Sequence, residues 1–166
     1  MARDTLAFSH WYHLNENLQQ SSKEFYNQLT QAIQKRKLPK VSLSQIYHKE
    51  GGVVSAKREY LRVKREEYIF DICAAPYGNG FFVSWWLGEK ISLLRTIMLS
   101  IPFLGAGIVA VFKPFTYYRM DAAMMFQESI HMAVLEVLEG IIEAKGLKAL
   151  SETERKPIMK DFLKNS

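Results

Sequence analysis

The stretch "SAKREYLRVKREEYIFDICAAPYGNGFFVSWWLGE", residues 55–89, decides the fold class of this chain. Apolar and polar side chains alternate along its first part, which is the two-residue period of a β-strand and not the 3.6-residue period of a helix. Turn-forming or charged residues interrupt it at 65–67 and at 76–80, and the dipeptide Asn79-Gly80 is a strong signal for a β-hairpin. We therefore predict three extended runs within this stretch.

A fourth strand is predicted just upstream. Val41, Leu43 and Ile46 follow the same short period, and Gly51-Gly52 supplies the turn that leads into residue 55. The four runs together predict an antiparallel meander. Its last strand, 81–87, is apolar on both faces, which is typical of a strand that is covered on two sides.

Two helices are expected to flank this meander, and the first precedes it. Ser21 followed by Glu24 matches a capping box, and apolar residues then recur at helical spacing up to Leu38-Pro39. The first twenty residues have no clear period, and we interpret them as an irregular arm.

The second and longer helix is predicted from Thr116 to Gly146, where glycine is a natural C-terminal stop. Its core face consists of Ala123, Phe126, Ile130, Ala133, Val134, Val137 and Ile141. Met125, Met132 and Leu135 interrupt the opposite face and predict a second contact, either with the sheet or with another subunit. A short final helix is predicted after Ser151, which again has a glutamate three residues on.

Residues 91–115, "ISLLRTIMLSIPFLGAGIVAVFKPF", contain no charged side chain between Arg95 and Lys113. A spanning helix needs about 20 apolar residues, so this stretch is of borderline length. Pro102, Gly105 and Gly107 lie near its middle, where they favour a turn between two short apolar arms. We predict an apolar helical hairpin that either inserts into a membrane or is buried in a soluble core.

The flanks of this stretch favour the membrane. Aromatic residues with a polar tip concentrate at membrane interfaces, and long cationic side chains reach the head groups from slightly deeper positions. The predicted membrane-interface residues are Trp85, Trp86, Arg95, Lys113, Tyr117 and Tyr118.

Composition limits the remaining choices. The chain has 166 residues, which we interpret as a single domain over 1–166, and its formal net charge is +5 with a pI of about 9.3. A positive balance favours anionic partners. Cys73 is the one cysteine of the sequence, which excludes an internal disulfide and fits a reducing compartment.

A row of side chains on the strand "KREYLRVKRE" is the candidate anion-binding surface. Strand alternation places Arg58, Tyr60, Arg62 and Lys64 on one face. Such a row suits anionic lipid head groups, and the alternative is a solvated face whose charges pair with nearby glutamates. Nucleic acid is an unlikely partner because no recognised nucleic-acid motif accompanies the row.

The sequence offers little for catalysis or cofactors. Glu128 and His131 match half of a di-metal helix motif, but no second copy follows, so we predict no metal site. Gly78-Asn79-Gly80 lacks the Lys-Ser/Thr ending and the helix start of a phosphate loop. We predict no catalytic residues and no cofactor.

The expected fold is therefore α+β: an N-terminal helix, a four-stranded antiparallel meander, an apolar helical hairpin, a long C-terminal helix and a short final helix. The expected function is that of a non-enzymatic protein associated with the cytoplasmic side of a membrane. Its sheet domain would bind another protein or anionic lipid head groups. One alternative is a soluble cytoplasmic oligomer that buries residues 91–115 in its core or interface. A second is a small ligand-binding domain or enzyme with a pocket at strand 81–86.

Overall fold

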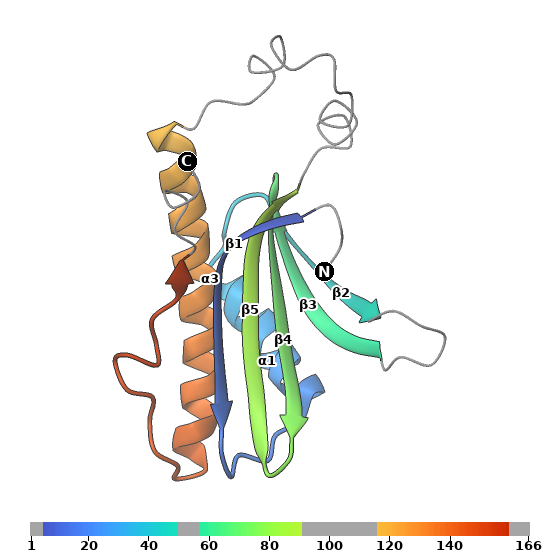
Figure 1. The fold of residues 1–166 in the computed structure, drawn as a ribbon, viewed down its shortest axis with the longest axis vertical. Coiled ribbons are helices and arrows are strands. Elements are labelled where there is room, and N and C mark those ends of the chain that lie inside the picture. Colours follow the sequence, from blue (N-terminus) through green and yellow to red (C-terminus); the bar gives the residue numbers. More distant parts are fainter. Residues whose placement is uncertain (1–4, 50–56, 91–115, 160–166) are drawn as a thin grey trace, which may run out of the picture.

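The computed structural model describes residues 5–49, 57–90 and 116–159 (Figure 1). The elements confirm the α+β class and follow one another as β1 (Thr5–Asn15), α1 (Ser22–Lys35), β2 (Val41–Lys49), β3 (Lys57–Arg65), β4 (Tyr68–Tyr77), β5 (Gly80–Lys90), α3 (Tyr117–Ala144) and β6 (Ile158–Met159). The predicted apolar hairpin at 91–115 lies outside the described residues. None of the described helices is long and apolar enough to cross a membrane.

The sheet is larger than the sequence predicts. The meander from β2 to β5 is present, but β1 pairs with the free side of β5, so the strand order is β2-β3-β4-β5-β1-β6 and every pair is antiparallel. Five long strands, and not four, therefore form the sheet, and the two-residue β6 adds a short sixth. The predicted hairpin between β4 and β5 is confirmed, with Tyr77 paired to Gly80.

The interpretation of the first twenty residues as an irregular arm was wrong. Residues 5–15 pair with β5 along its whole length, from Thr5 opposite Lys90 to Asn15 opposite Phe81. Polar and apolar residues occur on both faces of β1, and a register shift between Ala7 and Ser9 interrupts the ladder. Both features remove the two-residue period by which a strand is found in a sequence.

The predicted short final helix was also wrong. Ser151 and Glu154 do make the expected capping contact, with 2.6 Å between Ser151 Oγ and Glu154 Oε2, but this contact closes an isolated turn. Pro157 has no N–H to continue a helix. The backbone carbonyl of Glu154 instead accepts the indole N–H of Trp11 at 2.6 Å, which holds this segment against the sheet.

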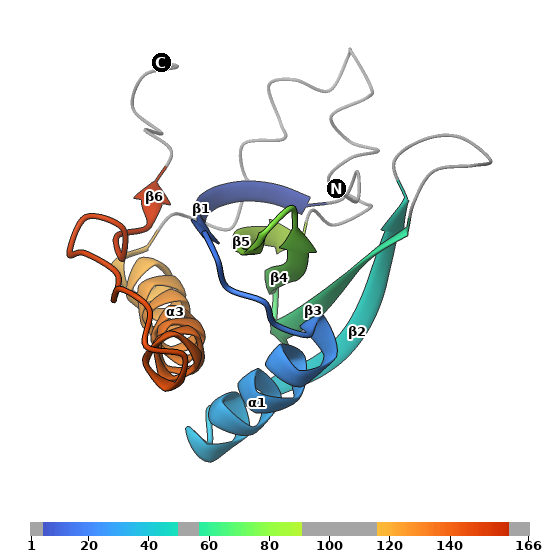
Figure 2. The same ribbon diagram turned by 90° about the horizontal axis from the view of Figure 1, so that it is seen from below.

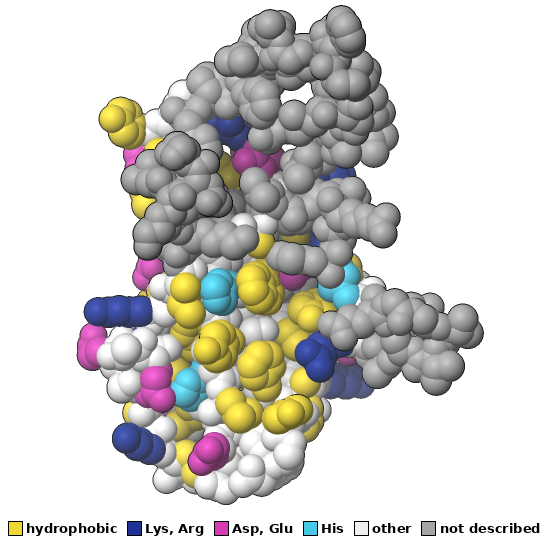
Figure 3. Space-filling view, viewed as in Figure 1, with side chains coloured by type: hydrophobic (Ala, Val, Ile, Leu, Met, Phe, Trp, Pro, Cys, Tyr) yellow, Lys and Arg dark blue, Asp and Glu magenta, His cyan; other side chains and the backbone are white. Residues whose placement is uncertain are grey.

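Both helices lie on one face of the sheet (Figure 2). α1 begins after Ser21, although the Ser21 side chain makes no cap hydrogen bond, and Glu24 accepts from Gln20 instead. α3 begins after Thr116, whose hydroxyl accepts from the Arg119 N–H at 3.3 Å. No described helix covers the opposite face, which we call the outer face (Figure 3).

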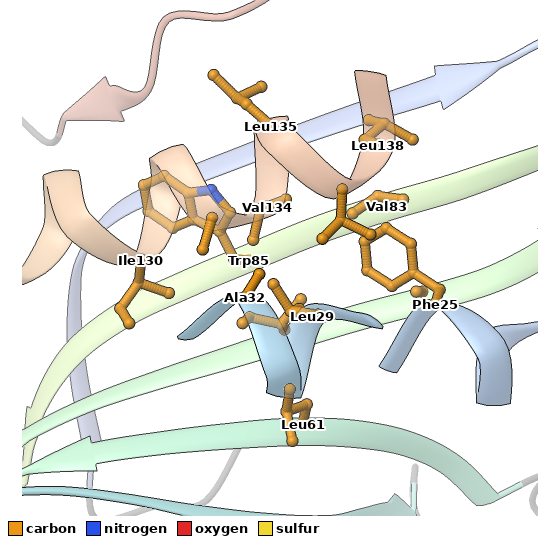
Figure 4. Packing of buried hydrophobic residues seen from close by; sticks show 14 of the residues in the cluster. Phe25, Leu29, Ala32, Leu61, Val83, Trp85, Ile130, Val134, Leu135 and Leu138 are labelled. Atoms are coloured by element: carbon orange, nitrogen blue, oxygen red, sulfur yellow. The ribbon is translucent and has the colours of Figure 1, made fainter. Parts of the chain in front are cut away.

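The core fills the space between the inner face of the sheet and the two helices (Figure 4). The inward-facing side chains of β5 are fully buried, which explains why this face of the strand is apolar. They are Phe81, Val83, Trp85 and Leu87. The predicted core face of α3 is confirmed, since six of its seven residues are buried and Ala123 packs against the cluster. Burial of each such large side chain contributes roughly 1.5–3 kcal/mol.

The Tyr26 hydroxyl joins two strands where their pairing stops. The ladder between β3 and β4 ends at Leu61 opposite Ile72, so the next pairs in register would be Tyr60 with Cys73 and then Glu59 with Ala74. The hydroxyl stands between the residues of this second pair: it accepts from the Ala74 N–H at 2.8 Å and donates to the Glu59 carbonyl at 2.9 Å. α1 thus supplies the hydrogen bonds that the diverging strands no longer give each other.

We expect Tyr26→Phe to lower the free energy of unfolding by about 1–3 kcal/mol, because the buried Ala74 amide loses its acceptor while the shape of the ring is kept. Urea denaturation followed by circular dichroism measures this change. Tyr47→Phe is the matched control, since Tyr47 is 61% exposed. Equal stability of the two variants would contradict the bridging role of Tyr26.

Candidate functional site

One end of the domain gathers segments that are far apart in the sequence. The ladder places Val41 opposite Arg65, Arg65 opposite Tyr68, Tyr68 opposite Glu89, and Thr5 opposite Lys90. One end of the sheet therefore contains the starts of β1, β2 and β4 and the ends of β3 and β5. α3 begins beside this end of the sheet, and we call the region the 90/117 end, after the residues at which β5 stops and α3 starts (Figure 1).

An ion-pair cluster fixes the start of α3 to this end of the sheet. Arg119 Nη2 lies 3.0 Å from Glu67 Oε1 and 2.9 Å from Glu89 Oε1, and all three side chains are less than one third exposed. The Tyr68 hydroxyl donates to the Arg119 carbonyl at 3.1 Å, and the Arg65 guanidinium donates to another carbonyl of α3 at 3.2 Å. The first turns of α3 therefore have a fixed position relative to the sheet.

These first turns expose apolar side chains that are normally buried. None of residues 117–125 is buried. The exposed side chains are Tyr117 (87%), Tyr118 (82%), Met120 (42%), Met124 (48%) and Met125 (59%). Large apolar residues gathered in this way on a soluble surface usually mark a contact with another molecule or with lipid.

Four lysines from three segments surround the same end. Lys37 and Lys40 lie on the loop between α1 and β2, Lys64 lies near the end of β3, and Lys90 is the last residue of β5; all four are exposed. Lys40 Nζ is 2.7 Å from Glu66 Oε1. The hydrogen bond to Glu66 is the main cause that raises the pKa of Lys40, and Tyr118 adds to it.

The predicted anion-binding row lies on the outer face of β3, since Leu61 and Val63 between its members point into the core. Arg62 is engaged by a two-pronged contact with Asp71, with both nitrogen to oxygen distances at 2.7 Å. Arg58 and Lys64 are exposed, Tyr60 is half-buried, and the two cations stand near opposite ends of the strand. Only Lys64 of this row belongs to the 90/117 end.

The predicted membrane-interface residues are divided by the structure. Trp85 is 0% exposed, and its indole N–H donates to His131 Nδ1 at 3.0 Å inside the core, so it is not available to lipid. Trp86 is 39% exposed on the outer face, where it stacks on His10. Tyr117 and Tyr118 are at the 90/117 end. Arg95 and Lys113 lie outside the described residues.

The outer face carries exposed apolar and aromatic side chains over β1 and β5 (Figure 3). Tyr12, Leu14 and Trp86 are 59%, 41% and 39% exposed. Cys73 is buried, and burial raises the pKa of its thiol, which makes it a poor nucleophile. The predicted pocket at strand 81–86 is not supported by the orientation of Phe81, Val83 and Trp85, which fill the core.

His131 has a structural position. Its Nδ1 accepts from Trp85 and its Nε2 donates to the Arg155 carbonyl at 2.6 Å, so both ring nitrogens are used. Burial is the main cause that lowers its pKa.

His131 also lines an open groove of about 570 Å³ between α3 and residues 155–157. In this groove Arg36 pairs with Glu136, and Arg155 pairs with Glu139. The described residues contain no cluster of three or more potential metal ligands.

The comparisons with known proteins do not assign a function. No protein-family model matches the chain, and no curated protein matches it significantly. A solved structure, that of TTHA0849 from Thermus thermophilus, aligns at 16% identity over 82% of this chain and 98% of that chain. Its TM-score is 0.27, which is too low to support a conclusion about fold or function.

The buried neutral His131 makes stability depend on pH. Its folded pKa lies below the ordinary value of 6.5, so below about pH 6.5 the unfolded chain binds a proton that the native chain does not. We expect the free energy of unfolding to fall as the pH decreases from about 7 to about 5. His13 contributes in the same direction, because burial lowers its pKa more than Glu154 raises it.

The measurement compares His131→Gln with the wild type by urea denaturation at several pH values. His131→Gln should flatten the dependence of the unfolding free energy on pH, whatever its effect on absolute stability. Parallel pH profiles for the wild type and His131→Gln would mean that His131 does not resist protonation in the native state.

Proposed function

We propose that this protein is a non-enzymatic, membrane-associated protein that contacts the bilayer through its 90/117 end, with the sheet domain on the cytoplasmic side. The observation that carries the proposal is the start of α3, where two tyrosines and three methionines are exposed and no side chain from 117 to 125 is buried. Their exposure to water is unfavourable, and the acyl and head-group region of a bilayer would remove it.

The types of these residues suit an interface. Tyrosine combines an apolar ring with a polar hydroxyl and is enriched where hydrocarbon meets head groups. Methionine is flexible and adapts to an irregular apolar environment. Arg119 would otherwise carry a charge into this region, and its contacts with Glu67 and Glu89 compensate that charge.

The connectivity supports the same end of the domain. The chain leaves the sheet at Lys90, whose N–H donates to the Glu67 carbonyl at 2.8 Å, and it returns at α3, where Arg119 contacts the same Glu67. The connecting residues include 17 consecutive positions, 96–112, without a charged side chain. An apolar stretch tethered at both ends to this end of the domain would reach a bilayer most directly on that side.

Fractionation of the expressed full-length protein tests the attachment. We expect the protein to stay in the membrane fraction after a high-salt wash and after alkaline carbonate, because salt screens charge contacts but does not weaken apolar insertion. Recovery of most of the protein in the soluble fraction without detergent would exclude the proposal. That outcome would favour the soluble oligomer that buries residues 91–115.

A fluorescence experiment tests which end meets the bilayer. We expect the tryptophan introduced by Tyr118→Trp to be quenched by lipids with brominated acyl chains, because the side chain would lie near the head groups. Tyr77→Trp is the matched control: Tyr77 is 70% exposed at the β4–β5 turn, the opposite end of the sheet. The native tryptophans contribute equally to both variants. Stronger quenching in Tyr77→Trp would reverse the proposed orientation.

A further inference from the structure

We infer that the 90/117 end selects bilayers that contain anionic phospholipids, through Lys37, Lys64 and Lys90. This inference rests on the proposed function, since it assumes that this end meets a membrane. It adds the class of lipid and assigns residues that no single stretch of sequence brings together.

The fold places the three lysines on one rim. Lys64 lies one residue before Arg65, which pairs with Tyr68 across the β3–β4 turn, and Tyr68 is in turn opposite Glu89, the neighbour of Lys90. Neighbouring strands are about 4.8 Å apart, so β3 and β5 are separated by roughly 10 Å. Lys37 lies on the loop that leads into β2, whose first residue Val41 is opposite Arg65.

Three acidic residues of this end are already paired with cations. Glu66 pairs with Lys40, and Glu67 and Glu89 share Arg119. In contrast, Lys37, Lys64 and Lys90 are exposed, and among the described residues none of them has an ion-pair partner within 4.0 Å. Asp121 on α3 is exposed and offsets one of these three positive charges. A positive excess therefore remains at the end of the domain that carries Tyr117 and Tyr118.

At the opposite end of the domain the described side chains show a smaller excess. Their exposed charges include both signs: Lys23, Arg58, Lys145 and Lys148, with Glu16, Glu24 and Glu143. The β4–β5 turn at that end, Tyr77 to Gly80, carries no charge. Exposed lysines, two exposed tyrosines and both ends of the apolar connection therefore occur together at the 90/117 end.

The chemistry explains why lysine suits this position. An ammonium group on a flexible four-carbon stem can reach a phosphate or carboxylate of a head group while its stem lies on apolar surface. Positive residues next to a membrane segment also favour the cytoplasmic side, where the leaflet is anionic. The attraction of the lysines to anionic lipid therefore accounts for both the selection of bilayers and the proposed orientation of the domain.

The test uses the full chain, diluted from detergent into vesicles, and measures flotation with neutral phosphatidylcholine vesicles or with vesicles that also contain phosphatidylserine. Three proteins are compared. They are the wild type, the triple variant Lys37→Gln, Lys64→Gln and Lys90→Gln, and a matched control with Lys23→Gln, Lys148→Gln and Lys156→Gln, three exposed lysines elsewhere on the domain.

At low salt we expect the wild type and the matched control to prefer phosphatidylserine vesicles on the order of a hundredfold, or roughly fivefold per lysine. The rim variant should lose this preference and keep its binding to neutral vesicles, and high salt should remove the preference of the wild type. Replacement of the same lysines by arginine should restore it.

The outcomes separate the two proposals. If the wild type floats with neither kind of vesicle, the membrane attachment itself is wrong. If it binds both kinds equally, or if the rim variant keeps the preference, the lipid selection is overturned while the attachment stands. A loss of preference in the matched control equal to that of the rim variant would show that overall charge, and not this rim, is responsible.

Discussion

The pairing of β1 with β5 is the contact on which the rest of the structure depends. It turns β5 from an edge strand into an interior strand and sets Trp11 opposite Trp85. Both indoles contact the ring of His131 from α3, and their N–H groups hold Glu154 and His131. The N-terminal strand, the sheet, the long helix and the C-terminal segment are therefore joined through one buried aromatic cluster, and β6 extends the sheet from the same strand.

The sequence predicts the local parts of this fold and misses the part that joins its two ends. The meander and the two helices have regular periods and short connections, so their residues identify them without tertiary information. β1 differs because its inner face includes Ser9, His13 and Asn15 while its outer face includes Tyr12 and Leu14. Only its partner, more than sixty residues away, makes it a strand. The turn at 151–155 was missed for a similar reason, since Trp11 and His131 fix its backbone.

The candidate site was predicted only where a linear pattern could find it. Tyr117, Tyr118 and Lys64 were identified, but Lys37 and Lys90 join them through the sheet register, which the sequence does not display. The linear pattern does not show that Arg62 is paired, because its partner, Asp71, is on the next strand. Trp85 and Trp86 cannot share one membrane interface, because adjacent residues of a strand point to opposite faces.

The rigid attachment of α3 to the sheet fixes the arrangement of exposed side chains at the 90/117 end. A surface ion pair is worth little by itself, but Arg119 bridges two carboxylates from different parts of the sheet edge, and all three side chains are partly shielded from water. The backbone of α3 is also held by Tyr68 and Arg65. The exposed tyrosines and methionines therefore keep a constant position relative to Lys64 and Lys90, which lie at the same end of the domain. Apolar and cationic groups fixed in this way can meet a single planar surface together, whereas a loosely connected helix would present each of them separately.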